Sequence, residues 1–271
     1  MTILLTGVTG LVGTRLLPRL ANAGFDCRAL VRGGKEVPSG VTAIDGDLLD
    51  PESLGRAVSG VSAIVHLAAV FRTLDTDLIW KSNLEGTRNL IAAAKDHAPR
   101  ARFIMSSTSN IYDANGARPG REDDAVEPKH AYPASKLAAE NELRASGLNW
   151  TILRLGFVYG DKDGHLESLP RHAATGKWHP AATMSTIHHR DIAAAVRLAL
   201  TGAMDGRIVN IVDEAPLSLY ELAQLVGDRL EPSSEPLVNP WKLHLDGSLA
   251  RSLGFQPIVR TVYQAAQENL L

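Results

Sequence analysis

Short apolar runs alternate with longer amphipathic segments through the first 160 residues of the chain. The apolar runs, predicted to be buried strands, cover residues 3–5, 29–31, 41–44, 63–66, 103–105 and 151–155. Between them, apolar residues recur every three or four positions in segments predicted to be helices, at 11–23, 51–58, 77–95 and 134–145. Alternating strands and helices indicate βαβ units, whose right-handed crossovers cover both faces of a parallel sheet. The pattern therefore predicts an α/β fold with a doubly wound parallel sheet.

The alternation weakens after residue 160. Residues 164–186 are irregular, and they precede a predicted helix at 190–200, a strand at 208–212, a helix at 218–230 and two short terminal elements. We interpret residues 161–271 as a mixed segment that completes the sheet and forms a small C-terminal substrate-binding lobe. Residues 113–130 are polar and rich in glycine, proline and acidic residues, which is consistent with either a lid or a passive surface loop.

The composition is that of an ordinary globular protein, with 45% hydrophobic and 21% charged residues. With 28 basic and 30 acidic residues the net charge is −2, which gives no reason to expect a nucleic-acid partner. The N-terminus lacks a signal-peptide pattern and no apolar run reaches membrane-spanning length, so a cytoplasmic protein without a membrane partner is expected. The single cysteine, Cys27, is interpreted as a buried apolar residue, and no metal site is expected.

A glycine-rich turn follows the first predicted strand. Gly7, Gly10 and Gly13 are spaced G-x-x-G-x-x-G between that strand and the first helix. The first permits a tight turn, the second permits close approach of a pyrophosphate, and the third lets the helix pack against the sheet. Free amides at the helix N-terminus attract phosphate. Residues 1–160 are therefore predicted to be a Rossmann core that binds NAD(P), with contacts from Gly7, Thr9, Gly10, Leu11, Val12 and Gly13.

Residues at the ends of the next strands are expected to lie next to the adenosine half of such a cofactor. Arg32 stands where NAD enzymes often carry an acidic residue for the ribose, and arginine can bind a 2′-phosphate bidentately. This favours NADP over NAD, although a solvated arginine at a strand end is the simpler alternative. Further cofactor contacts are expected from Asp47, Leu48, Leu67, Ala68 and Ala69.

A tyrosine and a lysine lie at the N-terminal end of the predicted helix 134–145. Tyr132 and Lys136 are four residues apart, so they share one helix face. A free tyrosine has a pKa of about 10 and is a poor base at neutral pH. A neighbouring ammonium, helped by the positive nicotinamide of an oxidised cofactor, stabilises the phenolate, which predicts a lowered pKa for Tyr132 and a role in proton transfer.

Taken together, these motifs resemble the extended short-chain dehydrogenase/reductases, the NAD-dependent epimerase/dehydratase family. The resemblance is carried by residues 6–13, 46–48, 66–69, 83–87, 106–112, 132–136, 154–160 and 188–192, which together span about two thirds of the chain in the family's order. It implies a dinucleotide-dependent enzyme in which Tyr132 and Lys136 are catalytic. One departure is Asp113, since members of the family often have glycine at this position.

The resemblance also implies roles for further residues. Thr108 corresponds to the hydroxyl that orients the reacting oxygen, with Ser107 as the alternative if the register is shifted by one. Asn83 is a third catalytic candidate, although organising the backbone is the better expectation for it. Ser106, Leu155, Gly156, Phe157 and Val158 are expected to contact the cofactor. The substrate pocket is expected to include Val70, Phe71, Thr108, Asn110, Phe157 and Trp178, with Trp80 and His179 as further candidates.

Three functions are consistent with these residues. The first is an NADP-favouring oxidoreductase that transfers a hydride to or from a small carbonyl or hydroxyl substrate. The second is a nucleotide-sugar epimerase or dehydratase with retained NAD, although no clear basic group for a diphosphate is evident apart from Arg171 or Arg190. The third is a non-enzymatic dinucleotide sensor, which the Tyr132–Lys136 pair disfavours. A homodimer is left open.

Overall fold

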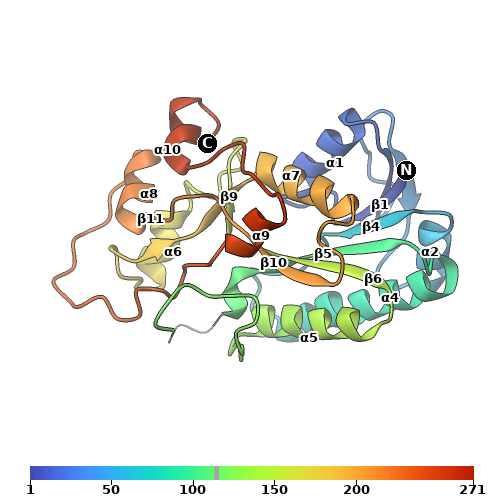
Figure 1. Cartoon of the computed structure of the whole chain (residues 1–271), viewed down its shortest axis with the longest axis horizontal. Coiled ribbons are helices and arrows are strands. Elements are labelled where there is room, and N and C mark those ends of the chain that lie inside the picture. Colours follow the sequence, from blue (N-terminus) through green and yellow to red (C-terminus); the bar gives the residue numbers. More distant parts are fainter. Residues whose placement is uncertain (113–115) are drawn as a thin grey trace.

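The computed structural model describes residues 1–112 and 116–271, and a seven-stranded sheet runs through its centre (Figure 1). The strands lie in the order β10-β6-β5-β4-β1-β2-β3, and all their pairings are parallel. Their bounds are β1 Thr2–Thr6, β2 Asp26–Val31, β3 Thr42–Asp45, β4 Ala63–His66, β5 Arg102–Thr108, β6 Asn149–Leu155 and β10 Arg207–Ile211. The chain winds outward in both directions from β1, so the doubly wound prediction is confirmed and a ligand crevice is expected beyond the carboxyl ends of β1 and β4.

Helices cover both faces of this sheet (Figure 1). One face packs against α1 (Gly13–Asn22) and α7 (His189–Leu200), with the short α9 (Ser248–Ser252) beside them. The other face packs against α2 (Pro51–Val58), α4 (Gly86–His97) and α5 (Ala131–Ala145). Successive residues of a strand point to opposite faces, and Leu4 accordingly lies in one apolar core while Ile3 and Leu5 lie in the other.

The segment after β6 builds a lobe at the carboxyl edge of the sheet (Figure 1). Two small sheets pair β7 (Phe157–Tyr159) with β9 (Thr186–His188), and β8 (Thr183–Met184) with β11 (Leu217–Ser218). Helices α6 (Leu169–Thr175), α8 (Leu219–Leu225) and α10 (Val262–Gln267) surround a third apolar core there. β10 returns from this half of the chain to the edge of the central sheet, where it pairs with β6.

Two predicted helices differ from those observed. The segment predicted at 77–95 is α3 (Thr76–Trp80), a π-helical turn (Lys81–Glu85) and α4 in succession. The helix predicted at 218–230 ends at Leu225, because Gly227 adopts a φ of +77° and the amide of Asp228 turns back to the carbonyl of Ala223.

The described part of the excursion 113–130 is attached to the C-terminal half. The amide of Gly120 donates to the carbonyl of His244, and the carboxylate of Glu122 accepts from the amide of Asn210 in β10. Arg121 forms an ion pair with Asp246 at 2.9 Å. Asp113, where the family often has glycine, lies outside the described residues. No helix in the described ranges is both long and apolar enough to cross a bilayer.

Candidate active site

A single cavity of about 1450 Å³ runs from the glycine turn, across the carboxyl ends of the central strands, into the C-terminal lobe. This volume exceeds the range of about 300–1,000 Å³ that is usual for one drug-sized ligand. The predicted cofactor contacts from Gly7 to Gly13, at 67–69 and at 155–158 all line it, together with Arg32, Asp47, Leu48 and Ser106. The fold therefore brings these dispersed predicted residues to one crevice, with room for a dinucleotide and a second molecule.

Two glycines of the turn are required by the packing of the protein itself, whereas the third leaves room for a ligand. Gly7 has a φ of +71°, and a Cβ there would lie 2.5 Å from the amide nitrogen of Ala68. A Cβ on Gly13 would lie 2.2 Å from the carbonyl oxygen of Gly7. A Cβ on Gly10 meets only that same oxygen, at 3.3 Å, so the protein itself nearly accommodates a side chain there. The missing side chain at Gly10 opens the cavity just before the N-terminus of α1, which fits a pyrophosphate.

At the end of the cavity predicted to bind adenosine, two charged residues have opposite effects on the affinity for NADP. The guanidinium of Arg32 is exposed and lies 3.6 Å from the carboxylate of Asp47. A 2′-phosphate would gain the arginine but would also face that carboxylate. The preference for NADP therefore stays a prediction.

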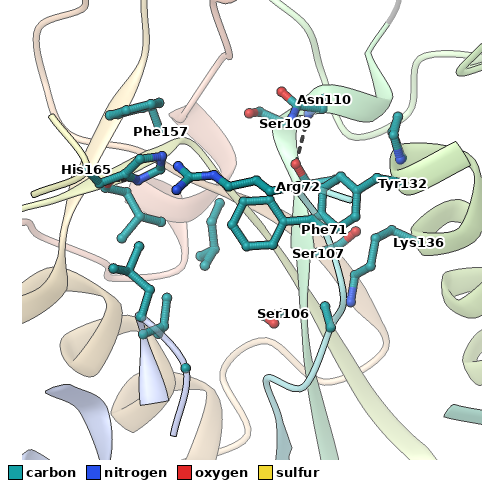
Figure 2. A pocket seen from close by; sticks show the side chains of 18 of the residues that line it. Phe71, Arg72, Ser106, Ser107, Ser109, Asn110, Tyr132, Lys136, Phe157 and His165 are labelled. Atoms are coloured by element: carbon teal, nitrogen blue, oxygen red, sulfur yellow. Dashed lines mark hydrogen bonds between the residues drawn. The ribbon is translucent and has the colours of Figure 1, made fainter. Parts of the chain in front are cut away.

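Three predicted catalytic residues meet on the cavity wall. Thr108 ends β5, Tyr132 lies in the first turn of α5, and Lys136 lies one turn further along the same helix. Figure 2 shows Tyr132 and Lys136 projecting from α5 toward the same part of the cavity. The side chain of Thr108 hydrogen-bonds with Tyr132 and also accepts from the amide of Asn110 at 3.1 Å.

Burial has the largest effect on the pKa values of Tyr132 and Lys136. It raises the pKa of Tyr132 to about 12, and hydrogen bonding to Thr108 opposes the increase. Burial also lowers the pKa of Lys136 to about 8, which the carboxylate of Glu140 counteracts. In the protein alone, burial therefore has the larger effect, and the lowered pKa expected for Tyr132 beside an oxidised cofactor stays a prediction.

Ser107 lines the same cavity, but its hydroxyl is engaged with a buried carboxylate. Its hydroxyl donates a short hydrogen bond to Glu140, which in turn forms a buried ion pair with Arg154 at 2.7 Å. Because the hydroxyl of Ser107 is bound to Glu140, Thr108 is the better candidate for the catalytic hydroxyl, and Ser107 stays the alternative.

The side chain of Asn83 hydrogen-bonds to the backbone of the loop after β4. It accepts from the amide of Val70 at 2.7 Å and donates to the carbonyl of Val70 and to the hydroxyl of Ser135, both at 3.0 Å. It is almost fully buried and does not line the cavity among the described residues. Asn83 is therefore a positioning residue for the loop after β4, not a catalytic one.

Most of the residues predicted to form a substrate pocket line the cavity, namely Val70, Phe71, Thr108, Asn110, Phe157, Trp178 and His179. Trp80 does not, because it lies in α3 on the outer surface and is 37% exposed. Neither candidate for a diphosphate contact, Arg171 or Arg190, belongs to the lining that the structure describes. Arg190 instead faces Asp161, at 3.9 Å.

Sequence reasoning missed Arg72 and His165, which face each other in the cavity (Figure 2). The Nδ1 atom of His165 lies 2.7 Å from the carbonyl oxygen of Val158 and its ring stacks on Phe157 at 4.1 Å. His165 belongs to an irregular stretch without a motif, and Arg72 lies in the loop after β4, where only Leu67, Ala68 and Ala69 were expected to contact the cofactor. The one available signal was a charged residue in the loop that follows this strand.

Comparisons with known proteins agree with this geometry. Residues 3–212 match the model of the NAD dependent epimerase/dehydratase family. An N-acetyl-alpha-D-glucosaminyl-diphospho-ditrans,octacis-undecaprenol 4-epimerase of Escherichia coli O157:H7 is 28% identical over 90% of this chain and 77% of its own length. A 4-hydroxy-2-methyl-3-oxo-4-farnesyl-3,4-dihydroquinoline-1-oxide ketoreductase of Stigmatella aurantiaca is 30% identical over 83% of this chain and 72% of its own.

A solved structure is similar over nearly the whole fold. The short-chain dehydrogenase/reductase superfamily protein of Agrobacterium tumefaciens, solved with bound NAD, superposes with a TM-score of 0.81 at 24% identity, covering 99% of this chain and 95% of its own. The family match extends over most of the chain and includes the glycine turn, β5 and the Tyr132–Lys136 helix. The chain therefore belongs to the NAD-dependent epimerase/dehydratase family.

Proposed function

We propose that this protein is an NAD-dependent epimerase that acts on a hydroxyl-bearing carbon of a sugar linked to a diphosphate. The observation that carries the proposal is the position of Thr108, Tyr132 and Lys136. They lie where the dinucleotide half of the cavity meets the half inside the C-terminal lobe. A substrate in the second half would present its hydroxyl to the phenol.

Thr108, Tyr132 and Lys136 have separate roles in this reaction. Thr108 orients the reacting oxygen, and Tyr132 accepts the proton of the substrate hydroxyl and later returns it. Lys136 stabilises the phenolate and holds the ribose beside the nicotinamide. When bound, NAD supplies the hydride acceptor of the reaction. Because the pKa of Tyr132 is about 12 in the protein alone, proton acceptance at neutral pH depends on cationic charge next to the phenol.

Two observations support a sugar diphosphate as the substrate. The cavity is larger than one dinucleotide-sized or drug-sized ligand needs, and Asp47, at the adenosine end, is the only carboxylate among the described residues that line it. The relative from Escherichia coli is named for 4-epimerisation of a diphosphate-linked sugar.

The test is incubation of the purified protein with NAD and UDP-glucose or UDP-N-acetylglucosamine. We expect the 4-epimer to appear by chromatography without net accumulation of NADH. The Tyr132→Phe variant should bind the same ligands and lose at least about a hundredfold in kcat, the contribution typical of proton transfer by a positioned side chain. Full turnover by Tyr132→Phe would refute the assigned chemistry.

A second candidate is a net oxidoreductase that uses NADP. Arg32 at the adenosine end and the relative named a ketoreductase favour it. It predicts stoichiometric change in the absorbance of reduced nicotinamide during turnover, and tighter binding of NADP than of NAD. An Arg32→Ala variant that keeps the same NADP:NAD preference would remove the support that this residue provides.

A further inference from the structure

Arg72 holds an unusual position beside the catalytic tyrosine. It follows β4 and has a φ of +62°, a conformation that residues other than glycine adopt infrequently and that often marks a functional site. Its guanidinium carbon lies 4.9 Å from the centre of the Phe71 ring, which in turn lies 5.5 Å from the centre of the Tyr132 ring. Figure 2 shows Arg72 extending from this stack across the cavity toward His165. The backbone and the stack thus direct a cation into the substrate half of the cavity.

No carboxylate compensates this cation within the part of the chain that the structure describes. Arg72 forms no ion pair there, and the only acidic residue along the cavity is Asp47 at the opposite, adenosine end. Lys177 and Lys242 line the same half of the cavity as Arg72. This half is therefore cationic although the whole chain carries a net charge of −2. Arginine is also the side chain best suited to bidentate binding of phosphate or carboxylate.

His165, opposite Arg72, supplies the complementary acceptor. Burial, reinforced by the charge of Arg72, lowers the pKa of His165 to about 4, so the ring is neutral at physiological pH. A neutral ring that donates from Nδ1 to the carbonyl of Val158 keeps Nε2 as a hydrogen-bond acceptor. An acceptor next to a guanidinium matches a ligand that carries a hydroxyl group close to an anionic group.

We propose that Arg72 is a specificity-determining residue that binds the anionic group of the substrate, a phosphate or a carboxylate, while a hydroxyl of the same molecule faces Tyr132. His165 accepts a hydrogen bond from a further hydroxyl. The placement of the substrate in this half of the cavity rests on the proposed function, but the anion site itself does not depend on whether the reaction is epimerisation or net oxidation.

The test is calorimetric titration of the NAD-saturated protein with pyrophosphate, UDP, uridine and glucuronate. Arg72→Gln removes the charge, Arg72→Lys keeps it without the bidentate geometry, and Arg229→Gln is a matched control at an exposed arginine outside the cavity lining. We expect wild type and the control to bind at least one of the anions equally. Arg72→Gln should bind it about 10- to 100-fold more weakly, as is typical for loss of hydrogen bonds to a charged group, and Arg72→Lys should lie between.

Equal anion binding by wild type and Arg72→Gln would overturn the proposal, as would wild type that binds none of the three anions. Unchanged affinity for NAD and for uridine, with an unchanged melting temperature, is expected of Arg72→Gln and separates a local effect from misfolding. If anion binding depends on Arg72 but no sugar nucleotide is epimerised, the inference stands and the proposed function falls. If wild type epimerises a sugar nucleotide and Arg72→Gln keeps the same kcat/KM, the inference falls alone.

Discussion

The Glu140→Gln substitution tests the buried network behind β5. Glu140 in α5 and Arg154 in β6 form an ion pair at 2.7 Å, with only 1% and 3% of their side chains exposed. Ser107 donates to the same carboxylate, and Arg154 also donates to the hydroxyl of Tyr112 at 2.9 Å. Removing one charge leaves the buried guanidinium uncompensated, which typically costs about 3–5 kcal/mol. We therefore expect the free energy of unfolding to fall by roughly that amount.

The chain offers a matched control on the same helix. Glu142 pairs with Arg88 at 2.6 Å, but their side chains are 39% and 52% exposed. An exposed pair contributes about 0–1 kcal/mol, so Glu142→Gln should barely change stability. Urea denaturation of the two variants at equal pH and salt measures the difference. A loss below about 1 kcal/mol for Glu140→Gln would refute the assignment of a strong buried pair.

The same substitution has a second readout at the active site. Glu140 raises the pKa of Lys136, which burial lowers to about 8. Without that carboxylate, the pKa of Lys136 falls further, and the ammonium is lost at a lower pH. If catalysis needs the charged lysine, activity declines as pH rises through this pKa, so the alkaline limb of the pH profile should move to lower pH in Glu140→Gln. An unmoved limb would show that Glu140 does not tune Lys136.

Three further predictions follow from individual contacts. Gly7→Ala should destabilise the fold, because the added Cβ meets Ala68 at 2.5 Å, whereas Gly10→Ala should fold and lose dinucleotide affinity; melting temperature and calorimetry separate the two effects. Burial raises the pKa of Asp213 to about 7, above its value of about 3.9 in the unfolded chain, so the folded state binds more protons between these values. Stability should therefore fall as pH rises from about 4 to 7, and Asp213→Asn should flatten this dependence in urea titrations; an unchanged slope would contradict it. Asn83→Ala leaves buried backbone groups of Val70 unpaired and should cost about 1–3 kcal/mol by the same measurement, and a neutral effect would deny its positioning role.

Local chemistry in the sequence determined most of the framework. Apolar periodicity located the strands and helices of the central sheet, since each element imposes its own spacing on buried side chains. Glycine directly after a helix commonly adopts a positive φ, because it has no Cβ, and Gly24 and Gly147 do so at the ends of α1 and α5. Tyr132 and Lys136 could be paired from spacing alone because one helical turn fixes their separation.

The tertiary structure decided which of the dispersed side chains meet. The sequence favoured Thr108 over Ser107, and the tertiary structure adds that the hydroxyl of Ser107 is bound to Glu140 of α5, although both residues line the cavity. Arg72 and His165 are far apart in the chain and belong to different halves, so no local pattern could place them opposite each other. Periodicity reports which face of an element is buried, whereas the convergence of side chains from separate loops depends on the order in which the strands assemble.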